Sequence, residues 1–237
     1  MKTKKQTFWD VKRSDIQYQN LYEQIADSLE EMILNDGTDF KRLPSEFDLV
    51  KKYGVSRSVI REALKTLKER GLVSMRVGDG SYVTIPKSEI ISQAVGRVTR
   101  FNGISDEKIT KVRSILESSS AGDAAVYATE KDITELENIV TQMEQFKGDI
   151  EKRIEKDCEF HLAIAKLSRN ELLAFMVESI MELLKKYIRD RLEQYPEGNE
   201  RGIIFHHKIL KAIKAHNSQQ AKKYMQQHIE ESFHQLD

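Results

Sequence analysis

Between residues 18 and 86, the apolar and polar positions predict a small unit of three helices and a β-hairpin. Apolar residues recur at helical spacing over residues 18–35, which predicts a first amphipathic helix. Two shorter helical patterns follow it. The stretches 72–77 and 81–85 then alternate like strands around a glycine-rich tip, which is typical of a hairpin.

Capping residues separate the two short helices. Ser45 followed by Asp48 has capping-box spacing, which predicts the start of the first short helix. Gly54 suits the left-handed turn that ends a helix, and Ser56 is a good N-cap for the next one. Gly71 ends that second helix. The order helix, tight turn, helix and hairpin predicts a winged helix-turn-helix.

The second short helix has one apolar and one basic face. The apolar face holds Ile60, Ala63, Leu64 and Leu67, and the basic face holds Arg57, Arg61, Lys65 and Lys68. The whole chain has no net charge, yet residues 41–76 contain ten Lys and Arg against four Asp and Glu. A basic face confined to this unit suits binding to DNA phosphates, and an ordinary solvated face is the alternative.

The rest of the chain predicts a helical bundle. Residues 1–17 read as an N-terminal arm that contains Phe8-Trp9, and 87–104 read as a linker with a short helix at 88–100. Residues 105–237 are helical almost throughout, with helices expected at 106–129, 131–147, 150–167, 170–194, 200–216 and 218–235. The predicted fold is therefore mostly α: a winged helix-turn-helix at 18–86, then an all-α bundle of six or seven helices whose interior holds a small ligand.

The composition of the chain also indicates the cellular compartment in which we expect the protein. Hydrophobic residues make up 39% of the 237-residue chain, and no run approaches the roughly 18 apolar residues of a membrane span. No apolar signal core follows the basic N-terminus. The single cysteine, Cys158, cannot form an internal disulfide, which fits a reducing environment. We expect a cytoplasmic protein with no membrane partner.

All six histidines lie after residue 160, which favours a site in the bundle. Asp157 and His161 are four residues apart, so they share one helical face, and His207 and His228 lie on the last two expected helices. Three imidazoles and a carboxylate form a plausible zinc site, with nickel or manganese as alternatives. Ordinary capping or surface histidines are the competing interpretation.

The first half of the chain resembles the GntR family of bacterial transcription regulators. The resemblance is carried by Leu43-Pro44-Ser45-Glu46, Val55-Ser56-Arg57, Ile60–Leu64, Leu67, Gly71-Leu72-Val73 and the glycines Gly78 and Gly80. It implies that Arg57, Ser58 and Arg61 contact DNA, with Ser45 at the same interface and Gly78 of the wing against the DNA backbone. Phe47 departs from the pattern, because the family usually has arginine directly after the Ser-Glu pair.

The second half resembles the FCD effector domain of the FadR subfamily. The segments DCEFHLAIAKLSRN and HKILKAIKAHNSQQAKKYMQQHI carry this resemblance. It implies that Asp157, His161, His207 and His228 hold a metal ion. Helical phase alone favours the neighbouring His206 over His207, and the family register favours His207. VRSILE matches Arg-x-x-Leu-Glu, so Arg113 is the candidate for binding an effector carboxylate, with an ion pair to Glu117 as the alternative.

Together these features predict a homodimeric transcription regulator that binds a palindromic DNA operator, most often as a repressor. A small carboxylic acid in the metal-containing bundle would control it. A metal-dependent enzyme is one alternative, although no His-Glu-x-x-His motif is present. A regulator whose signal is the metal ion itself is the other.

Overall fold

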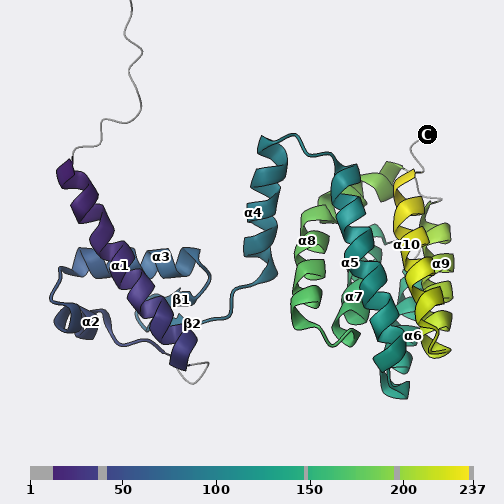
Figure 1. The fold of residues 1–237 in the computed structure, drawn as a ribbon, viewed down its shortest axis with the longest axis horizontal. Helices are drawn as coiled ribbons and strands as arrows, with labels where there is room; N and C mark the ends of the chain where they lie inside the picture. Colours follow the sequence, from purple (N-terminus) through teal and green to yellow (C-terminus); the bar gives the residue numbers. More distant parts are fainter. Residues whose placement is uncertain (1–12, 37–41, 147–148, 195–197, 235–237) are drawn as a thin grey trace, which may run out of the picture. The chain divides into compact units, whose positions relative to one another are not determined.

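The part of the chain that the structure describes is mostly helical. The computed structural model describes residues 13–36, 42–146, 149–194 and 198–234. The elements are α1 (Arg13–Asp36), α2 (Glu46–Tyr53), α3 (Arg57–Glu69), β1 (Val73–Arg76), β2 (Gly80–Val83), α4 (Ser88–Phe101), α5 (Asp106–Tyr127), α6 (Glu130–Gln145), α7 (Ile150–Leu167), α8 (Glu171–Gln194), α9 (Gly198–Lys214) and α10 (Ser218–His234) (Figure 1). The chain divides into two compact units, and the boundary along the sequence lies between Ile90 and Ile91. The expected order, a winged unit and then a helical one, is confirmed.

In the N-terminal unit, capping interactions position the two short helices. The Ser45 side chain accepts a hydrogen bond from the Asp48 amide, and Gly54 ends α2 with a φ of 67°. Ser56 caps α3 in the same way. The apolar face of α3 is fully buried, and it packs against α1. Burial of that face fixes the rotation of α3, so its basic residues face outward.

The wing is a two-stranded antiparallel hairpin. Val73 pairs with Val83 at its base, and Arg76 pairs with Gly80 beside the tip. Gly78 at the tip has a φ of 76°, which glycine adopts without strain. The Leu43 amide also donates to the Ser81 carbonyl, at 2.9 Å. The hairpin is thereby joined to the segment that leads into α2.

Some boundaries differ from the predicted ones. Helix α1 begins at Arg13, so residues 13–17, expected in the N-terminal arm, are helical. The Phe8-Trp9 pair lies outside the described residues. In the expected linker, α4 occupies Ser88–Phe101, close to the short helix predicted there. Within the described residues, no helix combines the length and the apolar character needed to cross a membrane.

Helix α5 lies at the centre of the C-terminal unit. It packs against α7, α8, α9 and α10, and Figure 1 shows it alongside α10. Ala121, Ala124 and Ala125 of α5 are fully buried in the main core. Such small side chains let neighbouring helices approach closely. Polar residues on the same helix can therefore reach side chains of several other helices.

Candidate metal centre and DNA interface

The exposed start of α3 carries the side chains predicted to contact DNA. Arg57 and Ser58 lie in its first turn and are exposed, and Arg61 lies one turn later and is also exposed. The Arg61 Nε donates to both carboxylate oxygens of Glu46, at 3.0 and 3.2 Å. This contact joins the start of α2 to α3. Glu46 therefore orients the Arg61 guanidinium and would compete with a base for it.

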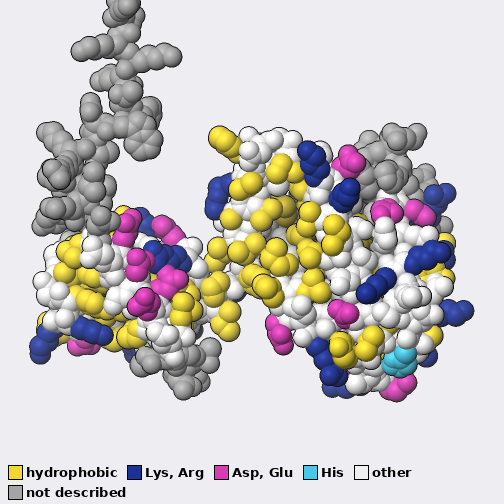
Figure 2. Space-filling model, viewed as in Figure 1, with side chains coloured by type: hydrophobic (Ala, Val, Ile, Leu, Met, Phe, Trp, Pro, Cys, Tyr) yellow, Lys and Arg dark blue, Asp and Glu magenta, His cyan; other side chains and the backbone are white. Residues whose placement is uncertain are grey.

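Acidic neighbours neutralise part of the basic surplus of this unit. Figure 2 shows acidic side chains gathered on the face that carries α1 and α3. Arg70 forms ion pairs with Asp27 and Glu30 of α1. Such contacts join helices and leave Arg70 less available to phosphate. Arg57 forms no ion pair within the described residues, so it is the strongest remaining candidate for reading a base.

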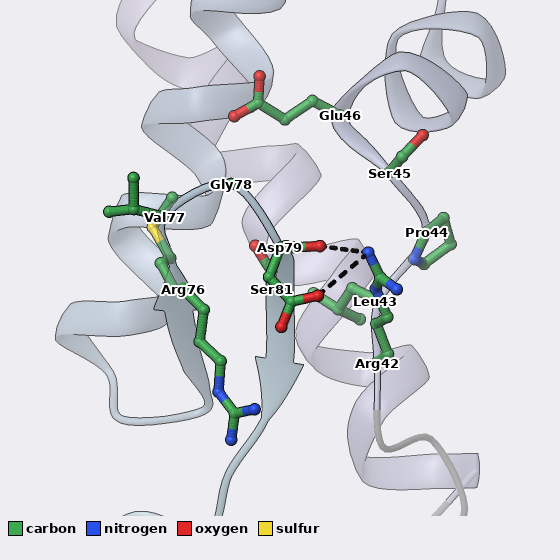
Figure 3. A pocket seen from close by; sticks show the side chains of 12 residues that line it. Arg42, Leu43, Pro44, Ser45, Glu46, Arg76, Val77, Gly78, Asp79 and Ser81 are labelled. Carbon is green, nitrogen blue, oxygen red and sulfur yellow. Dashed lines mark hydrogen bonds and ion pairs between the residues drawn. The ribbon is translucent and has the colours of Figure 1, made fainter.

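A hollow of about 350 Å³ separates the wing tip from the start of α2 (Figure 3). Arg42 reaches across it and donates to the Asp79 carbonyl, and its guanidinium lies 3.8 Å from the Asp79 carboxylate. Ser45 and Gly78 line opposite walls. A Cβ on Gly78 would meet no atom within 4 Å, so the tip is open on its outer side. Among the described residues, no side chain blocks the space around Gly78.

In the bundle, four side chains from three helices converge on one point. Asp157 and His161 come from α7, His206 from α9 and His228 from α10. One ligand atom from each lies within 4.8 Å of the others. All three imidazoles are buried. The four side chains therefore link α7, α9 and α10, three of the helices that pack around α5.

The separations within the cluster fit a shared cation. The His228 Nε2 lies 3.2 Å from both the His161 Nε2 and the His206 Nε2. The Asp157 Oδ1 lies 3.2 Å from the His206 Nε2 and 3.8 Å from the His161 Nε2. Ligand atoms about 2.0–2.1 Å from a tetrahedral zinc ion are separated by ~3.3–3.4 Å. Three of these four distances are close to that value, so the donor set suits zinc or a similar ion.

The choice of His207 as the third histidine is corrected by this geometry. His207 is exposed on α9, and its Nε2 lies 3.0 Å from the Glu144 Oε1. His206 occupies the place in the cluster instead. Adjacent residues on a helix point about 100° apart, so the two imidazoles project in different directions. Helical phase with Ile209 and Ile213, both fully buried, had favoured His206.

Arg113 and Glu117 of α5 lie beside the cluster and are buried. The Arg113 Nε donates to the Glu117 Oε1, one helical turn away, so the ion pair considered as the alternative is present. The Glu117 Oε2 contacts the His161 Nδ1. Within the described residues, the Arg113 Nη2 is buried without a hydrogen-bond partner.

Burial and mutual contacts shift the pKa values in this cluster. Burial lowers the pKa of His206 and, more strongly, that of His228, where the neighbouring imidazoles add to the effect. Burial alone would raise the pKa of Asp157, but the surrounding histidines hold it below its usual value. Burial also opposes ionisation of Glu117, but Arg113 and His161 outweigh it and lower its pKa to about 2. Neutral imidazoles and ionised carboxylates are the forms that bind a metal.

These shifts predict an acid-sensitive bundle when metal is absent. Below a pH of about 6.5, the unfolded chain protonates His206 and His228 more readily than the folded chain. Because folding lowers the pKa values of His206 and His228, these two residues contribute their full stability above that pH. This contribution is lost as the pH falls. Chelator-treated protein should lose at most about 1.4 kcal/mol of unfolding free energy per pH unit for each histidine. Denaturant unfolding between pH 8 and 5 measures this.

Two variants test this prediction: His228→Gln removes one of the buried imidazoles, and His207→Ala is the matched control. The first should flatten the dependence on pH, because one buried imidazole is gone. The second should retain the full dependence, because His207 lies on the exposed face of α9. An unfolding free energy that stays constant from pH 8 to 5 in the unmutated protein would contradict the prediction.

Comparison with known proteins agrees with both units. Residues 21–83 match the family model for bacterial regulatory proteins of the gntR family. Residues 108–231 match the FCD domain model, which covers more than half of the chain. This chain is a GntR-family regulator of the FadR-like subfamily. It is a DNA-binding transcription regulator, and the enzymatic alternative is set aside because the family and its named members are regulators.

Named relatives extend over most of this GntR-family chain. It is 32% identical over 192 residues to the HTH-type transcriptional regulator LutR of Bacillus subtilis (strain 168), covering 79% of this chain and 88% of LutR. It is 27% identical over 228 residues to the HTH-type transcriptional repressor NanR of Enterobacter sp. (strain 638), covering 92% and 86%. A solved structure of Streptococcus agalactiae GntR superposes with a TM-score of 0.69 at 29% identity, covering 89% of this chain and 97% of that one.

Two residues of this GntR-family regulator are more central than its sequence indicated. The sequence indicated Glu117 only as a partner of Arg113 and did not predict its contact with His161. The Glu46–Arg61 pair was not expected at all. Both contacts cross from one helix to another, where no spacing rule applies. The only sequence signal was the presence of each acid in a segment that resembles the family.

Proposed function

We propose that this regulator is a homodimeric repressor of a palindromic operator, and that a small carboxylic acid bound at a metal ion in its bundle releases it from DNA. The observation that carries the proposal is the Asp157–His161–His206–His228 cluster beside Arg113, whose buried Nη2 has no hydrogen-bond partner within the described residues. Regulators of this family bind DNA, and FCD domains bind small-molecule effectors. A protein that binds chromosomal DNA in a bacterium acts in the cytoplasm.

The metal would be held by those four side chains, with zinc favoured over nickel or manganese. When bound, such an ion would supply Lewis acidity, and a carboxylate oxygen would bind it by raising its coordination number above the four protein ligands. Arg113 supplies the second contact, since its Nη2 is buried and has no hydrogen-bond partner within the described residues. A guanidinium nitrogen pairs with a carboxylate directionally, which would orient the acid.

At the other end of the chain, Arg57 and Arg61 would read base edges in the major groove, with Ser58 and Ser45 at phosphates and Gly78 against the backbone. Their exposure on α3, at the cap of α2 and at the wing tip supports these roles. Two copies of the unit would bind the two half-sites of a palindrome. The acid acts only if it binds the DNA-free arrangement more tightly than the DNA-bound one. Repression is favoured because NanR carries that description.

A gel shift with DNA from the promoter of its own operon tests the proposal. Zinc-loaded protein should release this DNA on addition of one class among hydroxy acids, sugar acids and dicarboxylates, with a roughly 5–150-fold change in operator affinity. Metal-free protein should not respond to the acid. Release by zinc alone would instead establish the metal ion as the signal, and no response to any acid would contradict the effector role.

Arg113→Lys isolates the proposed contact with the acid. Lysine keeps a positive charge for Glu117 but lacks the guanidinium nitrogen, so about tenfold more acid should be needed for release. Operator affinity without the acid should stay unchanged. Arg189→Lys is the matched control, because Arg189 forms a surface ion pair with Glu151 at 2.7 Å. An equal acid requirement in Arg113→Lys and the unmutated protein would contradict the assignment.

A further inference from the structure

Glu117 is a buried carboxylate whose two oxygens lie toward different partners. The Glu117 side chain is 2% exposed and comes from α5, which supplies none of the four clustered side chains. Its Oε1 accepts a hydrogen bond from the Arg113 Nε. Its Oε2 contacts the Nδ1 of His161, in a geometry that falls short of an aligned hydrogen bond. An ion pair with Arg113 alone would need only the first of these contacts.

The three clustered histidines differ at the nitrogen that faces away from the others. The Nδ1 atoms of all three histidines are buried and make no aligned hydrogen bond within the described residues. Only the His161 Nδ1 has a carboxylate against it there. A histidine that binds a metal through Nε2 must carry its proton on Nδ1, and a carboxylate at Nδ1 fixes that tautomer and the ring orientation.

We propose that Glu117 is a positioning residue that accepts the Nδ1 proton of His161 and so aims the Nε2 lone pair of that ring into the metal site. The inference rests on the metal site of the proposed function and deepens it. With the Nε2 free of its proton, His161 is ready to bind the ion. The other two rings lack such a partner, so His161 is the fixed ligand to which they adjust.

The same carboxylate links the metal to the effector subsite. Glu117 holds the Arg113 guanidinium through its other oxygen, which leaves the Nη2 available for a carboxylate ligand. A change at His161 is therefore transmitted to Arg113 through a single rigid group. Zinc should strengthen binding of the acid, and the acid should strengthen binding of zinc by the same factor, because coupling between two ligands is reciprocal.

Competition with a fluorescent zinc chelator tests the positioning role, with Zn²⁺ alone as the probe. Glu117→Gln keeps the size of the side chain but weakens the acceptor at His161. Zinc affinity should fall by about 10–100-fold, the usual effect of losing a carboxylate behind a metal-binding histidine. Glu144→Gln makes the same change at an exposed Glu–His contact and should leave zinc affinity unchanged.

A second readout separates positioning from general damage. Nitrogen-15 NMR of the metal-free protein should show the His161 proton on Nδ1, and Glu117→Gln should remove that preference. If Glu117→Gln fails to fold because Arg113 is left buried without its partner, Arg113→Met/Glu117→Gln removes both charges together. This double variant should fold and still show the weakened zinc affinity.

Three outcomes would overturn the inference, and the first differs in its consequence from the other two. Unmutated protein that takes up no zinc would refute the proposed metal site and this role with it. Unmutated protein that binds zinc as tightly as a folded Glu117→Gln variant would leave the proposed function intact and refute the role of Glu117 alone. A His161 proton on Nε2 in the metal-free unmutated protein would also refute that role.

Discussion

Replacing His206 with alanine should abolish tight zinc binding, whereas replacing its neighbour His207 should leave zinc binding unchanged. His206 is buried and its Nε2 lies 3.2 Å from both the His228 Nε2 and the Asp157 Oδ1. His207 faces solvent and contacts Glu144. Zinc sites with four protein ligands bind with roughly 10–16 kcal/mol, so one ligand accounts for about 100–1,000-fold in affinity.

Zinc content after dialysis and chelator competition measure this effect. Added zinc should also raise the melting temperature of the unmutated protein and of His207→Ala, because a ligand that binds only the folded state stabilises it. It should not do so for His206→Ala. Circular dichroism of the metal-free variants checks that each still folds. If His207→Ala loses zinc and His206→Ala retains it, the cluster seen here is not the metal site.

Replacing Arg57 with alanine should remove operator specificity while the fold is retained. Arg57 is exposed at the start of α3, so its side chain contributes no packing to the buried face of that helix. A bidentate contact between arginine and guanine contributes about 1–3 kcal/mol of discrimination. The proposed dimer would lose two such contacts, so specific affinity should fall by roughly 30-fold to more than 10,000-fold.

Fluorescence anisotropy with operator DNA and with scrambled DNA of equal length separates specific from non-specific binding. Arg57→Ala should bind both with similar affinity, because the phosphate contacts that supply non-specific binding remain. Arg100→Ala is the control, since it removes the same charge from an exposed position outside the matched GntR region. Undiminished preference of Arg57→Ala for the operator would show that this arginine reads no base.

Features that depend on local sequence were predicted well. Ser45, Ser56 and Gly54 set the ends of α2 and α3 through contacts within a few residues, so their roles could be derived from spacing. The apolar face of α3 likewise follows from helical periodicity. The arm at residues 1–17 was predicted less well, because residues 13–17, which are polar except for Ile16, extend α1. Helix ends are the least certain part of any such pattern.

The sequence by itself determined that a basic helix lies ahead of a histidine-bearing helical bundle, because periodicity, capping and charge act between residues close along the chain. Only the tertiary structure decided which of His206 and His207 faces the interior, since that depends on how α9 is rotated against α7 and α10. It also decided that Glu117 lies against His161. Contacts between helices depend on packing in three dimensions, and no spacing along one chain encodes them.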